Sequence, residues 1–242
     1  MRPYVFILLL VFKASIIKAE DFKAEIYSAY ISGNMEKWEQ VLNNMEKLYQ
    51  SKPDIKLLEN IVEAQYGLIG FLIGEDQDDK AGKILIVAEK NLDLLMKRND
   101  KVARYWAYKC AFTGFKIGIS PYKAPFLGPR SFSYINEALA LDDHNPYVLM
   151  EYANGKYYAP AFAGGDKTLA ISTYDKAIHM LESDSVNLKN SWYYLMAKTN
   201  YGTALLKKGY KTNAIRIFDE ILIFEPRYSW VANELKPEAL KN

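Results

Sequence analysis

Residues 163–168, Ala-Gly-Gly-Asp-Lys-Thr, contain the residue types from which phosphate-binding loops are built. Such a loop needs the spacing G-x-x-x-x-G-K-[ST] after a strand, so that backbone N–H groups and a lysine reach the phosphates. Here the spacing differs, no strand pattern precedes it, and Asp166 would face the phosphates. We therefore interpret the stretch as a turn in which Gly164 and Gly165 allow a tight reversal and Asp166 caps the next helix.

The other side chains capable of chemistry do not form a catalytic or metal-binding set. Cys110 is the only cysteine, and no histidine is placed by sequence to activate it, so a buried thiol is the favoured interpretation. His144 and His179 lack a partner ligand at zinc-binding spacing. The acidic residues in 74–79 indicate a solvated loop that caps a helix. We expect no enzymatic activity, no metal and no cofactor.

The first nineteen residues differ from the rest of the chain. They have a basic start at Arg2, an apolar run over 4–12 that is too short to span a bilayer, and then small residues. This pattern predicts a secretory signal peptide, residues 1–19, cleaved after about Ala19. An uncleaved amphipathic anchor is the alternative, because Lys13 interrupts the apolar run. We expect a periplasmic or secreted protein.

The remaining residues, 20–242, have the composition of one globular domain. The full chain is 50% hydrophobic and 25% charged. It has 31 basic and 29 acidic residues, and removing 1–19 leaves 28 and 29. A mature charge of −1 predicts no general attraction to nucleic acid or anionic lipid, and we identify no Lys/Arg stripe. One cysteine allows no intramolecular disulfide, so the apolar core must hold the fold.

Helical spacing of apolar residues recurs from residue 22 to the end, and the segments fall into pairs. The clearest pair covers 201–226, where Gly202 is followed by Ala214, Phe218 and Pro226. A small residue lets helices approach closely, Ala214 and Phe218 share a helix face, and Pro226 ends the helix. This pair resembles the tetratricopeptide repeat (TPR), with its glycine, A-x3-F and proline positions.

The other pairs resemble the same repeat less closely. The preceding pair has Gly155 and Tyr158 in its first helix and a turn that is three residues longer. Small or apolar residues also recur at the packing positions of the other helices, namely Gly67, Ala81, Leu85, Ala88, Trp106, Cys110, Ala138, Ala170, Tyr174 and Ala177. The expected fold is therefore all-α, an α-solenoid of about five TPR-like antiparallel helix pairs with a short C-terminal capping helix broken at Pro237.

The layout also resembles small exported TPR proteins of Gram-negative bacteria that have no established role. The resemblance implies that the first helices of the pairs line a concave face, and tyrosine is concentrated in those helices. It also implies that the enlarged turns 74–79, 118–130 and 159–166 lie along one edge. The predicted partner-binding residues are Tyr66, Tyr105, Tyr108, Lys123, Phe126, Arg130, Tyr152, Tyr158 and Phe162. The alternative is that the tyrosines pack in the core and that Phe126 and Phe162 turn inward.

These features favour an exported, non-enzymatic scaffold that binds a protein or peptide through its concave face and its enlarged turns. The second hypothesis is a periplasmic carrier of a small ligand, associated with a transporter, with a pocket under the enlarged turns. We expect no nucleic-acid partner and no stable membrane span in the mature chain.

Overall fold

The computed structural model describes residues 22–183 and 188–241, and within these ranges the regular structure is helical with no strand. The predicted signal peptide, residues 1–19, lies outside the described residues. None of the helices described is both long and apolar enough to cross a bilayer.

The helices form antiparallel pairs joined by short turns. The pairs are residues 22–32 with α2 (Met35–Ser51), α3 (Ile55–Gly74) with α4 (Asp78–Arg98), α5 (Ala103–Ile119) with α6 (Ala124–Leu141), α7 (Pro146–Tyr158) with α8 (Lys167–Ser183), and α9 (Trp192–Lys207) with α10 (Lys211–Phe224). Short 3-10 turns precede α6 (Pro121–Lys123) and α8 (Ala161–Ala163). A π turn (Val231–Leu235) leads into the C-terminal α11 (Lys236–Lys241), which packs on α10.

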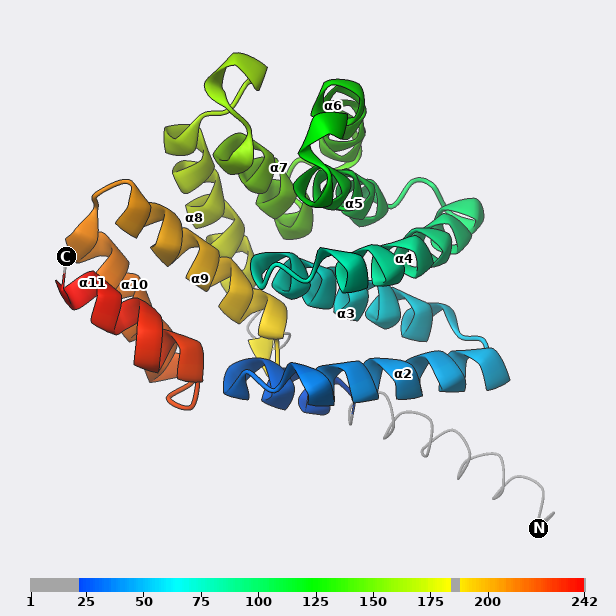
Figure 1. Cartoon of the computed structure of the whole chain (residues 1–242), viewed down its shortest axis with the longest axis horizontal. Helices are drawn as coiled ribbons and strands as arrows, with labels where there is room; N and C mark the ends of the chain where they lie inside the picture. The colour runs from blue at the N-terminus through cyan, green and yellow to red at the C-terminus, as the bar shows by residue number, and fades with distance from the viewer. Residues whose placement is uncertain (1–21, 184–187, 242) are drawn as a thin grey trace, which may run out of the picture.

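Successive pairs stack in chain order, so the predicted α-solenoid is confirmed. The stack curves until its two ends meet (Figure 1), where α10 and α11 return beside the start of α2. Tyr27 Oη donates a hydrogen bond to Glu225 Oε2 at 3.0 Å, and Tyr228 Oη donates to Tyr30 Oη at 2.8 Å. The first pair therefore contacts the last, and the solenoid is a closed arc.

Small residues set the distance between helices at two of the predicted positions. A Cβ atom on Gly202 would lie 2.6 Å from Phe218 Cε1, and one on Gly67 would lie 2.6 Å from Trp192 Cη2. Ala214 and Phe218 are fully buried on one face of α10. These packing roles are confirmed. The prediction that Gly155 allows close helix packing is wrong, because a Cβ atom there would meet nothing within 4 Å.

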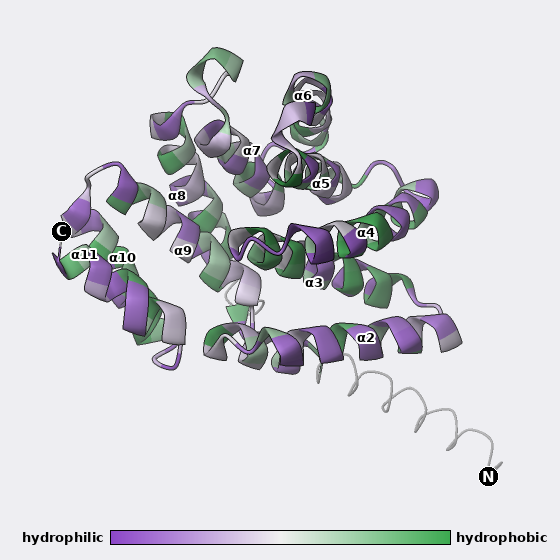
Figure 2. Ribbon diagram, viewed as in Figure 1, coloured by the Kyte–Doolittle hydropathy of each residue, from purple (hydrophilic) through white to green (hydrophobic). Residues whose placement is uncertain are grey.

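The second helices of the pairs also follow the predicted register. Most of the predicted packing residues are buried to 2% exposure or less, namely Ala81, Leu85, Ala88, Ala138, Ala170, Tyr174 and Ala177. Figure 2 shows hydrophobic residues where helices meet and a mostly hydrophilic outward face on α2. The apolar core is thus continuous along the stack, with a smaller cluster between α5 and α6 that contains Cys110.

Two prolines that were expected to interrupt helices lie inside them. The predicted loop 118–130 is shorter, because α6 begins at Ala124 and contains Pro129. Pro125 stands in the first turn of α6, where a backbone N–H has no helical partner to lose. Pro237 does not break the terminal helix either, because it lies within α11. The π turn Val231–Leu235 comes just before it, so the backbone there does not follow the regular α-helical hydrogen-bond pattern that a proline would interrupt.

The turn 159–166 has the structure that the sequence predicts. Gly164 has φ +87°, a left-handed conformation that favours glycine, and a Cβ atom on Gly165 would overlap the carbonyl oxygen of Ala159. Asp166 Oδ1 accepts hydrogen bonds of 3.0 Å from the N–H groups of Thr168 and Leu169. Asp166 therefore caps α8, and the glycines serve the reversal.

Replacing Gly202 with valine should destabilise the last pair, because the added side chain must displace the Phe218 ring. We expect a loss of about 1–3 kcal/mol in the free energy of unfolding, measured with urea. Gly114→Ala is the control, since a Cβ atom there meets nothing within 4 Å in the middle of α5 and should be neutral or stabilising. Equal losses in both variants would contradict the packing role of Gly202.

Candidate functional site

The inner side of the arc is filled by tyrosine side chains from four successive first helices. Tyr66 of α3, Tyr108 of α5, Tyr147 of α7 and Tyr193 of α9 form this inner tyrosine cluster. Ring centroids are 5.5 Å apart for Tyr66–Tyr108, 6.4 Å for Tyr108–Tyr147, 4.3 Å for Tyr147–Tyr193 and 6.3 Å for Tyr66–Tyr193. Each tyrosine thus contacts two others, and the four helices are joined through aromatic packing.

A buried carboxyl group lies against this cluster. Glu151 of α7 is 5% exposed, and it accepts hydrogen bonds from Tyr66 Oη at 2.7 Å and from Asn154 Nδ2 at 3.2 Å. Burial raises the pKa of Glu151 to about 7, although the two hydrogen bonds act in the opposite direction. The Tyr193 hydroxyl is buried nearby and has no hydrogen-bond partner among the described residues.

A cation from the chain itself, Arg104 of α5, lies against two rings of the cluster. The Arg104 guanidinium lies 4.6 Å from the ring centroid of Tyr147 and 5.5 Å from that of Tyr108. Arg104 Nη1 is 3.6 Å from Glu63 Oε2, so the acid and the base neutralise each other. Stacking on two rings and pairing with an acid satisfy this guanidinium internally.

The inner face is therefore packed rather than open, which corrects a prediction from the sequence. Tyr66, Tyr105 and Tyr108 are 5%, 3% and 2% exposed, and Tyr152 is half-buried with Lys156 Nζ 5.4 Å from its ring centroid. Because the first and last pairs meet, side chains of the first helices contact one another across the arc. These four tyrosines serve packing in this structure, as the alternative interpretation held.

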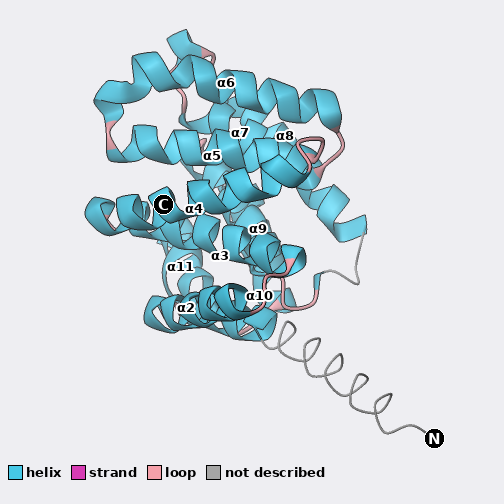
Figure 3. Cartoon of the chain, turned by 90° about the vertical axis from the view of Figure 1, so that its right-hand side faces the viewer, coloured by secondary structure: helices cyan, strands magenta, loops and turns pink. Residues whose placement is uncertain are grey.

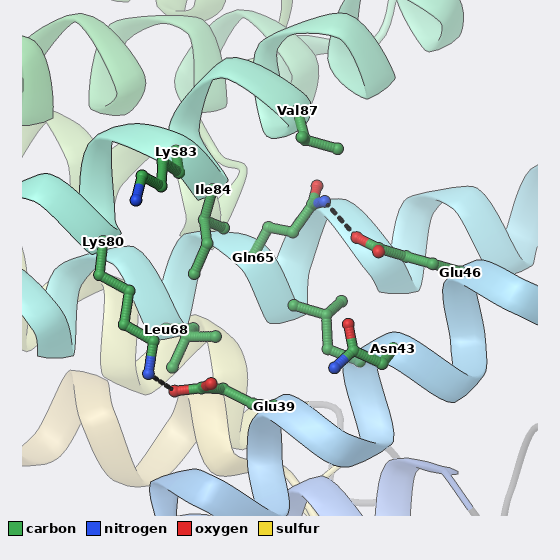
Figure 4. Close-up of a pocket in the computed structure, with 10 residues that line it drawn as sticks. Glu39, Asn43, Glu46, Gln65, Leu68, Lys80, Lys83, Ile84 and Val87 are labelled. Carbon is green, nitrogen blue, oxygen red and sulfur yellow. Dashed lines mark hydrogen bonds and ion pairs between the residues drawn. The ribbon is translucent and has the colours of Figure 1, made fainter.

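A cleft of about 240 Å³ lies between α2, α3 and α4 (Figure 4). Four of the polar side chains that line it already bind neighbours, namely Glu39, Glu46, Gln65 and Lys80. Gln65 Nε2 donates to Glu46 Oε1 at 2.9 Å, Asn91 Nδ2 donates to Gln65 Oε1 at 3.1 Å, and Lys80 pairs with Glu39. Burial raises the pKa of Glu46. The Gln65 amide and the carboxylates of Glu39 and Glu46 are therefore engaged within the protein.

The most exposed aromatic side chains of the described residues lie on the two enlarged turns. Tyr122 and Phe126 precede and begin α6 and are 76% and 78% exposed. Tyr158 and Phe162 lie at the turn between α7 and α8 and are 75% and 94% exposed. We call these four residues the aromatic edge. The expectation that Phe126 and Phe162 turn inward is wrong, because neither is covered.

Both turns join the first helix of a pair to the second, so in a stack of antiparallel pairs they lie along the same edge. The helices that they join, α5 to α8, occupy the upper part of Figure 3. Insertions in repeat proteins map to loops on one face, which is often the binding face. Lys123 and Arg130 flank Phe126 and are exposed, as predicted. Tyr122 was not among the predicted site residues, although its position between Pro121 and Lys123 within an enlarged turn could have indicated it.

The remaining chemically capable residues stay apart from one another. Burial raises the pKa of the Cys110 thiol to about 12, and its Sγ lies 3.3 Å from Ser131 Oγ. The buried thiol predicted for Cys110 is thus confirmed. His144 is exposed beside Asp143. Across residues 22–183 and 188–241, no group of three or more His, Cys, Asp or Glu side chains is arranged to hold a metal ion.

No protein-family model matches the chain, and no curated protein matches its sequence. Solved structures do resemble its fold. The HusA haemophore from Porphyromonas gingivalis aligns with a TM-score of 0.59 and 14% identity over 76% of this chain and 93% of its own. TTC0263, a thermophilic TPR protein of Thermus thermophilus, aligns with a TM-score of 0.54 and 13% identity over 86% and 93%. The fold is therefore a TPR-like solenoid.

The raised pKa of Glu151 predicts a pH-dependent stability. Its folded pKa of about 7 exceeds the ordinary value of 4.5, so its contribution is complete below pH 4.5 and declines as the pH rises to about 7. Glu151→Gln should remove this decline. Between these pH values its free energy of unfolding should rise, relative to that of the parent, by up to about 3 kcal/mol. Urea unfolding at several pH values measures the gain.

Glu225→Gln is the matched comparison for this titration. Arg227 hydrogen bonds hold the pKa of Glu225 at about 2, so its contribution is present above pH 4.5 and is lost only as the pH falls toward 2. The parent and Glu225→Gln should therefore share the same pH dependence between 4.5 and 7. If the stability of Glu151→Gln also declined between pH 4.5 and 7, Glu151 would not be the source of that pH dependence.

Proposed function

We propose that this protein is an exported, non-enzymatic helical scaffold that binds a protein or peptide partner through its aromatic edge. The exposure of Tyr122, Phe126, Tyr158 and Phe162 supports the proposal most directly. Single exposed apolar side chains are common on protein surfaces, whereas several large ones on one face mark interaction sites. Tyrosine and phenylalanine are also enriched in the cores of protein interfaces.

The geometry favours the edge over the two other surfaces. On the inner face, a partner would have to separate the tyrosine rings that join α3, α5, α7 and α9. In the cleft between α2 and α4, a partner would have to replace the hydrogen bonds of Gln65. At the edge, a partner covers aromatic carbon that is already in water, so binding gains apolar burial without breaking packing.

Replacing Phe126 and Phe162 together with serine should abolish capture of the partner from the envelope fraction of the native cells. Because both side chains are exposed, the melting temperature should hardly change. The control is Ile86→Ser with Ile223→Ser, which removes apolar side chains that are 58% and 81% exposed on α4 and α10. Undiminished capture by the double phenylalanine variant would refute the edge. Recovery of the protein from the cytoplasm alone, with none in the envelope or the medium, would refute export.

A second candidate function is that of a carrier for a small, flat, anionic ligand. The HusA haemophore has a similar fold across 93% of its chain, although the low identity limits this similarity to the fold. The edge combines aromatic side chains with Lys123 and Arg130, which suits an apolar ring system with carboxylates. The cleft of about 240 Å³ is smaller than the pockets that usually hold drug-sized ligands. The hollow of about 490 Å³ at residues 76–80 is lined by three aspartates, which disfavour an anion, so such a ligand would also bind at the edge.

Titration with haemin separates the two candidates. A carrier should show a saturable shift of the haemin absorbance band at one equivalent, and Phe126→Ser with Phe162→Ser should weaken that binding about tenfold. The Ile86→Ser and Ile223→Ser variant should bind as the parent does. A linear, unsaturable response that is equal in all three proteins would exclude haemin as the ligand and leave the protein-binding candidate.

A further inference from the structure

Basic residues are concentrated in the helix pair that carries half of the aromatic edge. Residues 101–136, which include α5 and most of α6, contain six basic residues and no acidic residue. Residues 20–100 contain ten basic and sixteen acidic residues. The third helix pair is therefore locally basic, although the chain as a whole is nearly neutral. The basic side chains are separated by several residues each, so they do not form a run that is visible in the sequence.

Half of these positive charges are neutralised by the neighbouring pair. Arg104 pairs with Glu63 at 3.6 Å, Lys109 pairs with Asp93 at 3.6 Å, and Lys116 pairs with Glu89. All three acids belong to α3 and α4. The basic side of α5 therefore helps to dock its pair on the acidic pair before it, and these charges are not available to a partner.

The charges on the enlarged turn are not neutralised in this way. Lys123 and Arg130 are exposed, and neither forms an ion pair with any residue that the structure describes. Arg130 lies four residues after Phe126 in α6, so the two side chains are neighbours on the helix surface. Positive charge and exposed aromatic carbon thus occur together at the edge.

The turn between α7 and α8 adds positive charge to the same side. Lys156 Nζ donates a hydrogen bond to the Gly164 carbonyl at 3.0 Å, and Lys167 Nζ lies 5.5 Å from the Tyr157 ring centroid. The only acid in this turn is Asp166, whose carboxylate accepts the N–H groups at the start of α8. The edge as a whole therefore presents cations and aromatic rings with little opposing charge.

We propose that the partner bound at the aromatic edge presents an acidic peptide segment that also carries apolar side chains. This inference rests on the proposed protein-binding function and names the chemistry of its partner. Carboxylates of the segment would pair with Lys123 and Arg130, since arginine binds carboxylates in a bidentate geometry. Its apolar side chains would cover Phe126 and Phe162. Charge complementarity of this kind selects partners and speeds association.

An anionic membrane is the other macromolecular surface with this complementarity, and the charge count disfavours it. Lipid-binding segments contain about four to eight clustered Lys or Arg residues, each contributing about 1 kcal/mol near the surface. Among the described residues of the α5–α6 turn only Lys123 and Arg130 are unpaired, and Lys156 is engaged with Gly164. Two directed charges beside aromatic rings suit a peptide better than a bilayer.

Binding of two labelled peptides tests the inference by fluorescence anisotropy. One peptide alternates glutamate with leucine, and the other alternates lysine with leucine. We expect the glutamate peptide to bind at least about tenfold more tightly, and its affinity to fall about tenfold between about 50 and about 300 mM salt. Lys123→Glu with Arg130→Glu should weaken it by a similar factor.

The control variant is Lys97→Glu with Arg98→Glu, which reverses the charge of the same two residue types. Both residues are exposed in the last turn of α4, next to the connection to the following pair. It should bind the glutamate peptide within about twofold of the parent. Equal binding of both peptides, or no effect of reversing Lys123 and Arg130, would overturn the inference. Binding to phosphatidylglycerol vesicles that the same reversal abolishes would also overturn it, in favour of a membrane.

The envelope capture experiment separates this inference from the function on which it rests. If Phe126→Ser with Phe162→Ser loses the captured partner while Lys123→Glu with Arg130→Glu retains it at every salt concentration, the edge binds a partner that is not acidic. If both variants retain the partner, the edge is not the binding surface and both proposals fail.

Discussion

The structure depends on the contact between Trp192 and the space that Gly67 leaves beside α3. A Cβ atom at Gly67 would lie 2.6 Å from the Trp192 ring, and that ring also packs edge-on against Trp38 at 5.0 Å between centroids. The three residues belong to the last, second and first pairs of the stack. One indole ring therefore joins the first, second and last pairs of the solenoid, and any side chain at Gly67 would force these pairs apart.

Closure of the arc determines what the inner face can do. In an open solenoid, first-helix tyrosines would face water and could contact a peptide. Here Tyr66 of α3 and Tyr193 of α9 lie 6.3 Å apart across the arc, and Glu151 is buried against the same cluster. A carboxyl group in such surroundings keeps its proton up to about neutral pH because burial disfavours its charged form. The inner face is thus a polar-aromatic core, which is why we propose the aromatic edge as the binding surface.

The HusA haemophore and the TPR protein TTC0263 are both similar to this chain in fold, although their names describe different kinds of protein. Folds of this kind accept many functions because function lies in local sites. In this chain the surface with the most exposed aromatic side chains is formed by the two enlarged turns. Phe162, on the turn between α7 and α8, is 94% exposed. The identity of a partner must therefore be sought at the turns, in their aromatic rings and in the charge of Lys123 and Arg130.

The sequence by itself determined the paired helices, the close packing at Gly202 and the cap at Asp166, because periodicity, small residues and caps act between near neighbours in the chain or within one repeat. It also contained the basic composition of 101–136, which was missed because the charges are dispersed. Only the tertiary structure decided that the arc closes and that Tyr66 and Tyr108 are buried. Closure depends on contacts such as Tyr30 with Tyr228, 198 residues apart, and no local pattern specifies how far successive pairs will curve.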